Sequence, residues 1–378
     1  ITNFTNSLIL GHQTTGTLDS ADGNTAVGYA AMDAITSGDN NVAVGFTSLS
    51  ANTTGSSNVA VGKDALAVNT TGAENIAIGT DALTANTTAS YNIGIGTDAG
   101  LAITTGDRNI AIGYQALKTN TVGDRSVAVG YSALYTQEPS SNADMANVAI
   151  GNLSMYSTTT GTNNTGVGFN TMFANTTGAS NVAVGYGALD ANTTASSNTA
   201  VGSAALGANT TGASNVAVGN NALDAQTTEG FNTAVGSEAG SANTSGSGMV
   251  AVGYQALDAN TTGDFNTGLG YQALGANTTA SNNTAVGYYA LLANTTGADN
   301  VAMGKGALAA NTTGSYNIGI GKHTLDANTT ADSNTAVGEG SMSTNTTGAS
   351  NTALGRQALY ANTTGADNVA VGYQSLDA

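Results

Sequence analysis

The sequence predicts an all-β fold, a parallel β-solenoid (β-roll) of about 22 coils with a 17-residue repeat. Three observations support this prediction. A pentad of the form Asn, β-branched residue, Ala or Gly, aliphatic residue, Gly recurs every 17 residues from Gly28 to Gly372, except for one step of 21 between Gly130 and Gly151. Glycine makes up 51 of 378 residues, and only 8% are charged. Such a chain lacks bulky side chains, so its apolar surface must be buried in a thin core.

Within one coil, the pentad predicts a strand. Counting from its asparagine in the copy 198–214, position 2 (Thr199) is β-branched in all 21 regular copies, and position 4 (Val201) is always Val, Ile, Leu or Met. The strand ends at position 5, Gly202, where the chain turns. A second extended run is predicted over residues 205–211, followed by a turn at residue 212. Frequent glycine and Asn-Thr-Thr segments argue against a helix.

The repeat continues through the chain, so we expect a single repeat domain over residues 1–378. Its first coil, residues 1–23, is atypical, because the pentad there is degenerate. An insertion loop is predicted at 135–146, where four residues are added and the only proline, Pro139, occurs. We expect a tolerated loop, so that deleting residues 137–140 leaves stability nearly unchanged; the alternative is a special contact.

Position 3 predicts the assembly state. It is Ala in 17 and Gly in 4 of the 21 regular copies, whereas a solvent-facing position would vary toward polar residues. We expect position 4 to face the core of the coil and position 3 to meet another subunit, since a strand sends alternate side chains to opposite faces. The sequence therefore predicts a homo-oligomer. The interface candidates are Ala183, Ala200, Ala217, Ala234 and Ala251.

Charge and composition exclude several classes of function. The net charge of -17 argues against nucleic acid and against a grip on anionic lipid, because both need basic residues. No run approaches 18 apolar residues, so we expect no membrane insertion in this segment. Without cysteine the chain has neither disulfides nor thiolate metal sites. It opens on Ile1 and lacks a signal sequence, and we expect it to be a segment of a longer or processed protein.

The phrase Asn-Thr-Ala-Val-Gly-Tyr-Gln-Ala-Leu occurs almost unchanged at 109–117, 249–257, 266–274 and 351–359. It resembles the head-domain repeat of trimeric autotransporter adhesins of the YadA type, and similar arrays occur in phage tail fibres. The pentad Ser126 to Gly130 matches the Ser-Val-Ala-Ile-Gly-like signature of that family. The resemblance covers essentially the whole chain and implies a left-handed β-roll with three chains around one axis. The family repeat is shorter, because here an Ala-Asn-Thr-Thr-Gly segment lengthens each coil.

Aromatic residues at position 6 are the main candidates for a binding surface. This position is Tyr or Phe in 10 of 21 copies, which suits stacking against sugar rings, although the rings could instead cap the thin core. The surface-binding candidates are Tyr114, Tyr131, Tyr186, Tyr254, Tyr271 and Pro139.

The remaining motifs have simpler structural interpretations. His12 and His323 are too far apart to share a site within one chain, and two glycine-rich segments that resemble phosphate loops, residues 94–100 and 319–322, are not followed by a predicted helix. Aspartates at positions 10 and 16 recur irregularly, so structural calcium is possible but not favoured, and we expect no other cofactor. We predict no catalytic and no metal-binding residues.

The Asn-Thr-Thr and Asn-Thr-Ser segments form 14 N-x-Ser/Thr sequons. Their regular spacing predicts ladders of asparagine and threonine that hydrogen-bond along the stack. An ice-binding threonine array is an alternative, but adjacent threonines of an extended run point to opposite faces.

The sequence thus predicts a non-enzymatic fibre or adhesin segment, located outside the cell, on a cell surface or on a virion. It would act as a rigid shaft or head that presents repeated surfaces for attachment. The expected partners are its own copies in a homotrimer and a receptor on a host cell or other surface, possibly a glycan. The alternatives are an ice-binding solenoid and a subunit of a self-assembling extracellular filament.

Overall fold

The computed structural model describes residues 8–10 and 20–377. Most of the predicted first coil, including His12, therefore lies outside the described residues. The chain forms two compact units, residues 1–194 and 195–378, and each is described by itself.

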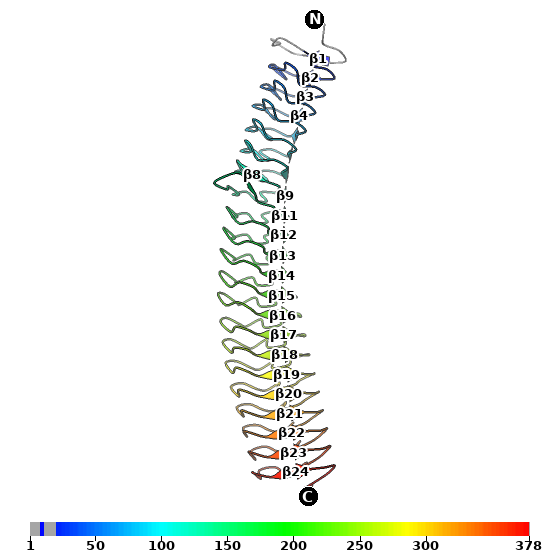
Figure 1. Cartoon of the computed structure of the whole chain (residues 1–378), viewed down its shortest axis with the longest axis vertical. Coiled ribbons are helices and arrows are strands. Elements are labelled where there is room, and N and C mark those ends of the chain that lie inside the picture. Colours follow the sequence, from blue (N-terminus) through cyan, green and yellow to red (C-terminus); the bar gives the residue numbers. More distant parts are fainter. Residues whose placement is uncertain (1–7, 11–19, 378) are drawn as a thin grey trace. The chain divides into compact units, whose positions relative to one another are not determined.

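The first unit is a stack of coils joined by one parallel sheet (Figure 1). Neighbouring strands pair in register, as in Val42 opposite Val59 and Ala43 opposite Ala60. The separate short strands β8 (Gly123–Asp124) and β10 (Ala143–Asp144) pair with each other. The strands of the sheet are β1 (Leu8–Leu10), β2 (Thr25–Val27), β3 (Val42–Val44), β4 (Val59–Val61), β5 (Ile76–Ile78), β6 (Ile93–Ile95), β7 (Ile110–Ile112), β9 (Val127–Val129), β11 (Val148–Ile150), β12 (Thr165–Val167) and β13 (Val182–Val184).

The second unit repeats this arrangement without an insertion (Figure 1). Each strand pairs in parallel with the strand of the next coil, as in Ala217 opposite Ala234. The strands are β14 (Thr199–Val201), β15 (Val216–Val218), β16 (Thr233–Val235), β17 (Val250–Val252), β18 (Thr267–Leu269), β19 (Thr284–Val286), β20 (Val301–Met303), β21 (Ile318–Ile320), β22 (Thr335–Val337), β23 (Thr352–Leu354) and β24 (Val369–Val371). The predicted fold class, a parallel β-solenoid with a repeat of about 17 residues, is confirmed, and the solenoid has about 20 turns.

The glycine at position 5 is required where each strand ends. Gly202 has φ of 140°, and a Cβ there would lie 2.3 Å from the carbonyl oxygen of Gly219 in the next coil. Only glycine allows the two backbones to approach so closely. The invariant glycine of the repeat is thus fixed by the spacing of the coils.

The predicted second strand over residues 205–211 is wrong, because this part of the coil consists of turns. Ala204 and Leu206 have φ of 54° and 52°, in the left-handed region, and Ser214 closes the coil with φ of 60°. Alternating left-handed residues reverse the chain within a few residues, which an extended run cannot do. β-Branched residues rarely adopt such angles, and Thr47 is the only β-branched residue among the described residues with positive φ.

The interior of each coil is thin and partly polar. Alanines at positions 3 and 8 and leucine at position 9 are fully buried, as in Ala200, Ala205 and Leu206. Asparagines at positions 1 and 12 are also buried and hydrogen-bond along the stack. The Asn277 Nδ2 donates to Oδ1 of Asn260 at 2.8 Å, and the Asn294 Nδ2 donates to Oδ1 of Asn277 at 3.0 Å. The predicted asparagine ladder is therefore confirmed, and it satisfies amides that would be costly to bury alone.

The two faces of the strand are the reverse of our prediction. The interface candidates Ala183, Ala200, Ala217, Ala234 and Ala251 are all 0% exposed inside their own coil. Position 3 is small because a leucine of the preceding coil packs against it. Where this position is glycine, at Gly268, a Cβ would lie 3.2 Å from two side-chain carbons of Leu257. Burial of these alanines therefore gives no sign of a neighbouring chain.

Candidate functional site

The outer face of the sheet is the most continuous surface of both units. Positions 2 and 4 point outward, and their side chains are partly or largely exposed in every described strand of the sheet. Val235 is 37%, Leu269 44% and Met303 41% exposed. Neither position holds a charged residue in any regular copy. Each unit thus presents two uncharged ladders, rich in aliphatic and threonine side chains, along its whole sheet.

The candidate tyrosines at position 6 lie on the surface and stack on each other. Tyr114 and Tyr131 have ring centroids 5.5 Å apart, and Tyr271 lies 5.3 Å from both Tyr254 and Tyr288. These candidate tyrosines are 41–65% exposed. Tyr186 stacks on Phe169 in the same way, at 5.6 Å.

Stacking changes what these rings offer to a ligand. A ring inside the ladder, such as Tyr271, has a neighbouring aromatic ring against each face and leaves mainly its edge to solvent. A sugar packs on the face of an aromatic ring, where the apolar area is largest. The ladder therefore stabilises the contact between coils more directly than it forms a sugar platform.

The insertion at 135–146 is largely built into its coil. Gln137 takes the place of the position 12 asparagine, is fully buried, and donates from Nε2 to Oγ of Ser126 at 3.0 Å. Its Oε1 accepts a hydrogen bond from Nδ2 of Asn147 at 3.0 Å. Pro139 is buried, so its prediction as a surface-binding residue is wrong. Deleting residues 137–140 would remove this buried amide, and we now expect it to destabilise the coil.

The Asn-Thr-Thr segments are also committed to the stack. The position 12 asparagine of most sequons is buried, as at Asn209, whose Nδ2 donates to the carbonyl of Gly212 at 3.0 Å. The first threonine donates its hydroxyl to the next coil, as from Thr295 to the carbonyl of Thr312 at 3.0 Å. One of the two threonine hydroxyls is therefore occupied, which disfavours a two-dimensional ice-binding array.

The aspartates at position 16 accept hydrogen bonds from the preceding coil. The Oδ1 of Asp264 accepts from the backbone N–H of Ser247 at 2.8 Å, and that of Asp107 accepts from Ser90 at 2.7 Å. Those at position 10 are half-buried, and burial raises the pKa of Asp190, Asp224 and Asp258. Within residues 8–10 and 20–377, no group of three carboxylate or histidine side chains could hold a metal ion. These aspartates serve the backbone of the stack.

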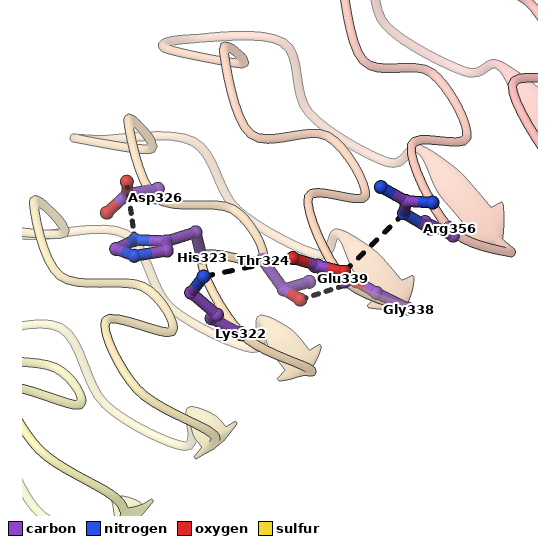
Figure 2. Close-up of polar contacts among 7 residues, drawn as sticks. All are labelled: Lys322, His323, Thr324, Asp326, Gly338, Glu339 and Arg356. Carbon is purple, nitrogen blue, oxygen red and sulfur yellow. Dashed lines mark hydrogen bonds and ion pairs between the residues drawn. The ribbon is translucent and has the colours of Figure 1, made fainter.

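His323 belongs to a cluster of charged residues in the second unit (Figure 2). Its Nδ1 lies 3.1 Å from Oδ2 of Asp326. Beside it, Glu339 lies between Lys322, at 3.9 Å, and Arg356, at 3.5 Å. These three residues occupy position 6 in consecutive coils, so an ion-pair ladder replaces the aromatic ladder here. His323 was predicted to be an isolated surface residue, whereas the 17-residue alignment already places the members of this cluster together.

No helix long and apolar enough to span a membrane occurs in the part of the chain that the structure describes. Searches with protein-family models and among curated proteins find no match to this sequence. The similarity that the structure supports is therefore that of fold, a β-solenoid with a repeat of about 17 residues.

Proposed function

We propose that this chain is a non-enzymatic fibre segment that assembles through the outer face of its sheet and presents repeated surfaces for attachment. The occupant of that face is a second and a third copy of the same chain, in a homotrimer. The segment acts outside the cell or on a virion, as a shaft or head of an adhesin or tail fibre. Many weak contacts along such a fibre add through avidity.

One observation carries this proposal: positions 2 and 4 form uncharged, partly exposed ladders along each sheet. Soluble monomers rarely leave so long an apolar strip in water. A standard protein interface needs about 800 Å² from each partner, and the two outward side chains of each strand, repeated along the sheet, supply a surface of that order. Because positions 2 and 4 hold uncharged residues at every level of the strip, copies can align coil by coil.

The resemblance to YadA-type head repeats favours three chains over two. A cyclic arrangement also gives every copy the same environment, as closed homo-oligomers require. An open filament would instead need contacts that do not close, and an ice-binding solenoid would leave its flat face free for water. One threonine hydroxyl of most Asn-Thr-Thr segments donates to the next coil, as at Thr295, and this gives the ice-binding alternative no support.

Charge placed on the sheet face tests the proposal. We expect the triple variant Val235→Lys, Leu269→Lys and Met303→Lys to lose assembly while its circular dichroism remains that of a β-protein, because three ammonium groups cannot be buried between chains. The matched control adds the same charge at exposed positions away from the sheet, Thr211→Lys, Thr262→Lys and Thr296→Lys. An unchanged mass for the sheet-face variant would contradict the proposal, as would equal loss of assembly in the control.

A further inference from the structure

The second unit contains a hollow beside its charged cluster, and it arises from a gap in two side-chain ladders. In the copy 334–350, positions 7 and 10 hold the small residues Gly340 and Ser343. The following coil holds Gln357 and Tyr360 at the same positions, and the preceding coil holds His323 and Asp326. The small side chains at Gly340 and Ser343 leave a hollow of about 370 Å³, which is lined by these six residues together with Glu339 and Arg356. Pockets for small ligands start at about 300 Å³.

One wall of the hollow is an aromatic ring without the stacking found elsewhere. Tyr360 is 38% exposed, and two of its ring carbons lie 3.9 and 4.0 Å from where a Cβ of Gly340 would be. The ring therefore extends over the glycine. None of the stacked pairs among the described residues includes Tyr360, in contrast to Tyr271, which is covered on both faces. Its apolar face is thus the one in this region that a ligand could cover.

On the side of the hollow opposite Tyr360, the imidazole of His323 is directed toward the preceding coil. The imidazole lies over Gly306 of the preceding coil, and a Cβ on Gly306 would be 2.9 Å from Nδ1 of His323. The same nitrogen lies 3.1 Å from Asp326, which holds the ring in place. His323 and Asp326 therefore form a polar side of the hollow, and Gly340 lies between them and the ring of Tyr360.

The residues that line the hollow include two carboxylates, Asp326 and Glu339, and one cation, Arg356. Two cations, Lys322 and Arg356, flank the carboxylate of Glu339, and Asp326 supplies a second carboxylate. An anionic ligand would meet both carboxylates, so the site has no excess positive charge to attract it. Carboxylates accept hydrogen bonds, while guanidinium and amide N–H groups donate them. A ligand whose groups both donate and accept, and which has one apolar face, satisfies this lining.

We infer that this hollow binds a neutral saccharide, with the sugar ring against Tyr360 and its hydroxyls toward Asp326, Glu339, Arg356 and Gln357. The inference names a ligand class for the attachment function proposed above, and it rests on that function for its use in a fibre. The hollow itself is formed by one chain at positions 6, 7 and 10, whereas assembly is assigned to positions 2 and 4. Binding and assembly can therefore fail separately.

The test is saturation-transfer NMR and titration calorimetry with maltose, cellobiose, lactose and di-N-acetylchitobiose, and with a uronate-containing disaccharide for comparison. We expect at least one neutral disaccharide to bind and Gly340→Gln to weaken its Kd at least tenfold by filling the hollow. Glutamine occupies position 7 with positive φ in other coils, for example Gln255 and Gln357, so this substitution preserves the fold. Tyr360→Ala should weaken binding similarly.

The matched control is Gly187→Gln, the same change at position 7 of the first unit, where a Cβ meets only Asp190 at 3.9 Å. It should leave the Kd unchanged. The inference is overturned if none of the four neutral sugars binds, if only the uronate binds, or if Gly340→Gln binds as the unsubstituted chain does. A trimer that binds no sugar would contradict this inference alone, and a monomer that binds sugar would contradict the assembly alone.

Discussion

At the scale of single residues, three aspartates of position 10, Asp190, Asp224 and Asp258, oppose folding through their burial. Asp258 is half-buried at the outer turn, and burial, followed by the nearby charge of Glu238, raises its pKa. Asp224 has the same environment. In contrast, the hydroxyl of Thr47 and then the ammonium of Lys63 lower the pKa of Asp64. The same residue type therefore opposes folding at one site and favours it at another.

Replacing Asp258 by Asn should raise the stability of the fold at pH 7. A raised folded pKa means that the folded state binds its proton more tightly, so the contribution of Asp258 to stability falls as pH rises through that pKa. The gain should be below about 1 kcal/mol, because the group is partly solvated. It should vanish below pH 3.8, the ordinary pKa of the group, where the carboxyl is protonated in both states.

Asp64→Asn is the control with opposite sign, since a lowered pKa stabilises the fold above the ordinary value. We expect it to lose stability at pH 7 and to lose nothing at low pH. Chemical denaturation at pH 3 and pH 7 measures both variants. A gain for Asp258→Asn that persists at pH 3 would show that its cause is not the carboxylate charge.

Position 3 shows where prediction from the sequence reached its limit. Its restriction to Ala and Gly correctly indicated close packing on that face, but alternation alone does not say which face is inside. The missing information was the path of the chain after Gly202, which brings Leu206 and its equivalents over the alanines rather than over position 4.

At the scale of the element, one coil compensates for a change in its neighbour. Position 9 is Gly240 where most coils have leucine or methionine, and position 1 of the next coil is Met249 where nearly all coils have asparagine. A Cβ on Gly240 would lie 2.5 Å from Cε of Met249, so the methionine fills the space that the leucine would occupy. Both residues are needed to complete the interior at this level.

We therefore expect Gly240→Leu and Met249→Asn to be destabilising alone and compatible together. The single leucine clashes with Met249, and the single asparagine leaves a void, at a cost of about 1–3 kcal/mol each. Leucine is compatible with the backbone, because Leu223 and Leu257 have φ of 52° and 54° at the same position. The double variant restores the repeat, and its coupling energy should be about 1–3 kcal/mol.

Guanidinium unfolding of the two single variants and the double variant measures this coupling. Strictly additive effects would contradict the packing that we describe. The pair could have been found from the sequence by aligning both exceptions to the repeat, since they occur nine residues apart in adjacent copies.

The strand of each coil was predictable, and the turns were not. β-Branched residues at position 2 and glycine at position 5 define the strand and its end. The extended run predicted over residues 205–211 is wrong, because the chain reverses there through left-handed residues. The absence of β-branched residues at positions 7 and 9, apart from Thr47, was the signal for these turns.

At the scale of the whole molecule, the repeat separates internal packing from the outward face of the sheet. Buried alanine, leucine and asparagine hold each coil to the next, and the outward residues of positions 2 and 4 remain partly exposed. The hollow near Tyr360 is formed by residues at several positions in three consecutive coils, so no single sequence motif predicts it. Assembly through the sheet face is the central claim, because it assigns a role to the one surface that every coil shares.

The molar mass in solution, measured by light scattering after size exclusion and by sedimentation equilibrium, tests this claim most directly. For a chain of 36.9 kDa, we expect a single species of three times that mass, independent of concentration over the measured range. A stable species with the mass of one chain would contradict assembly through the sheet face. A distribution that grows with concentration would contradict a closed trimer and favour an open filament.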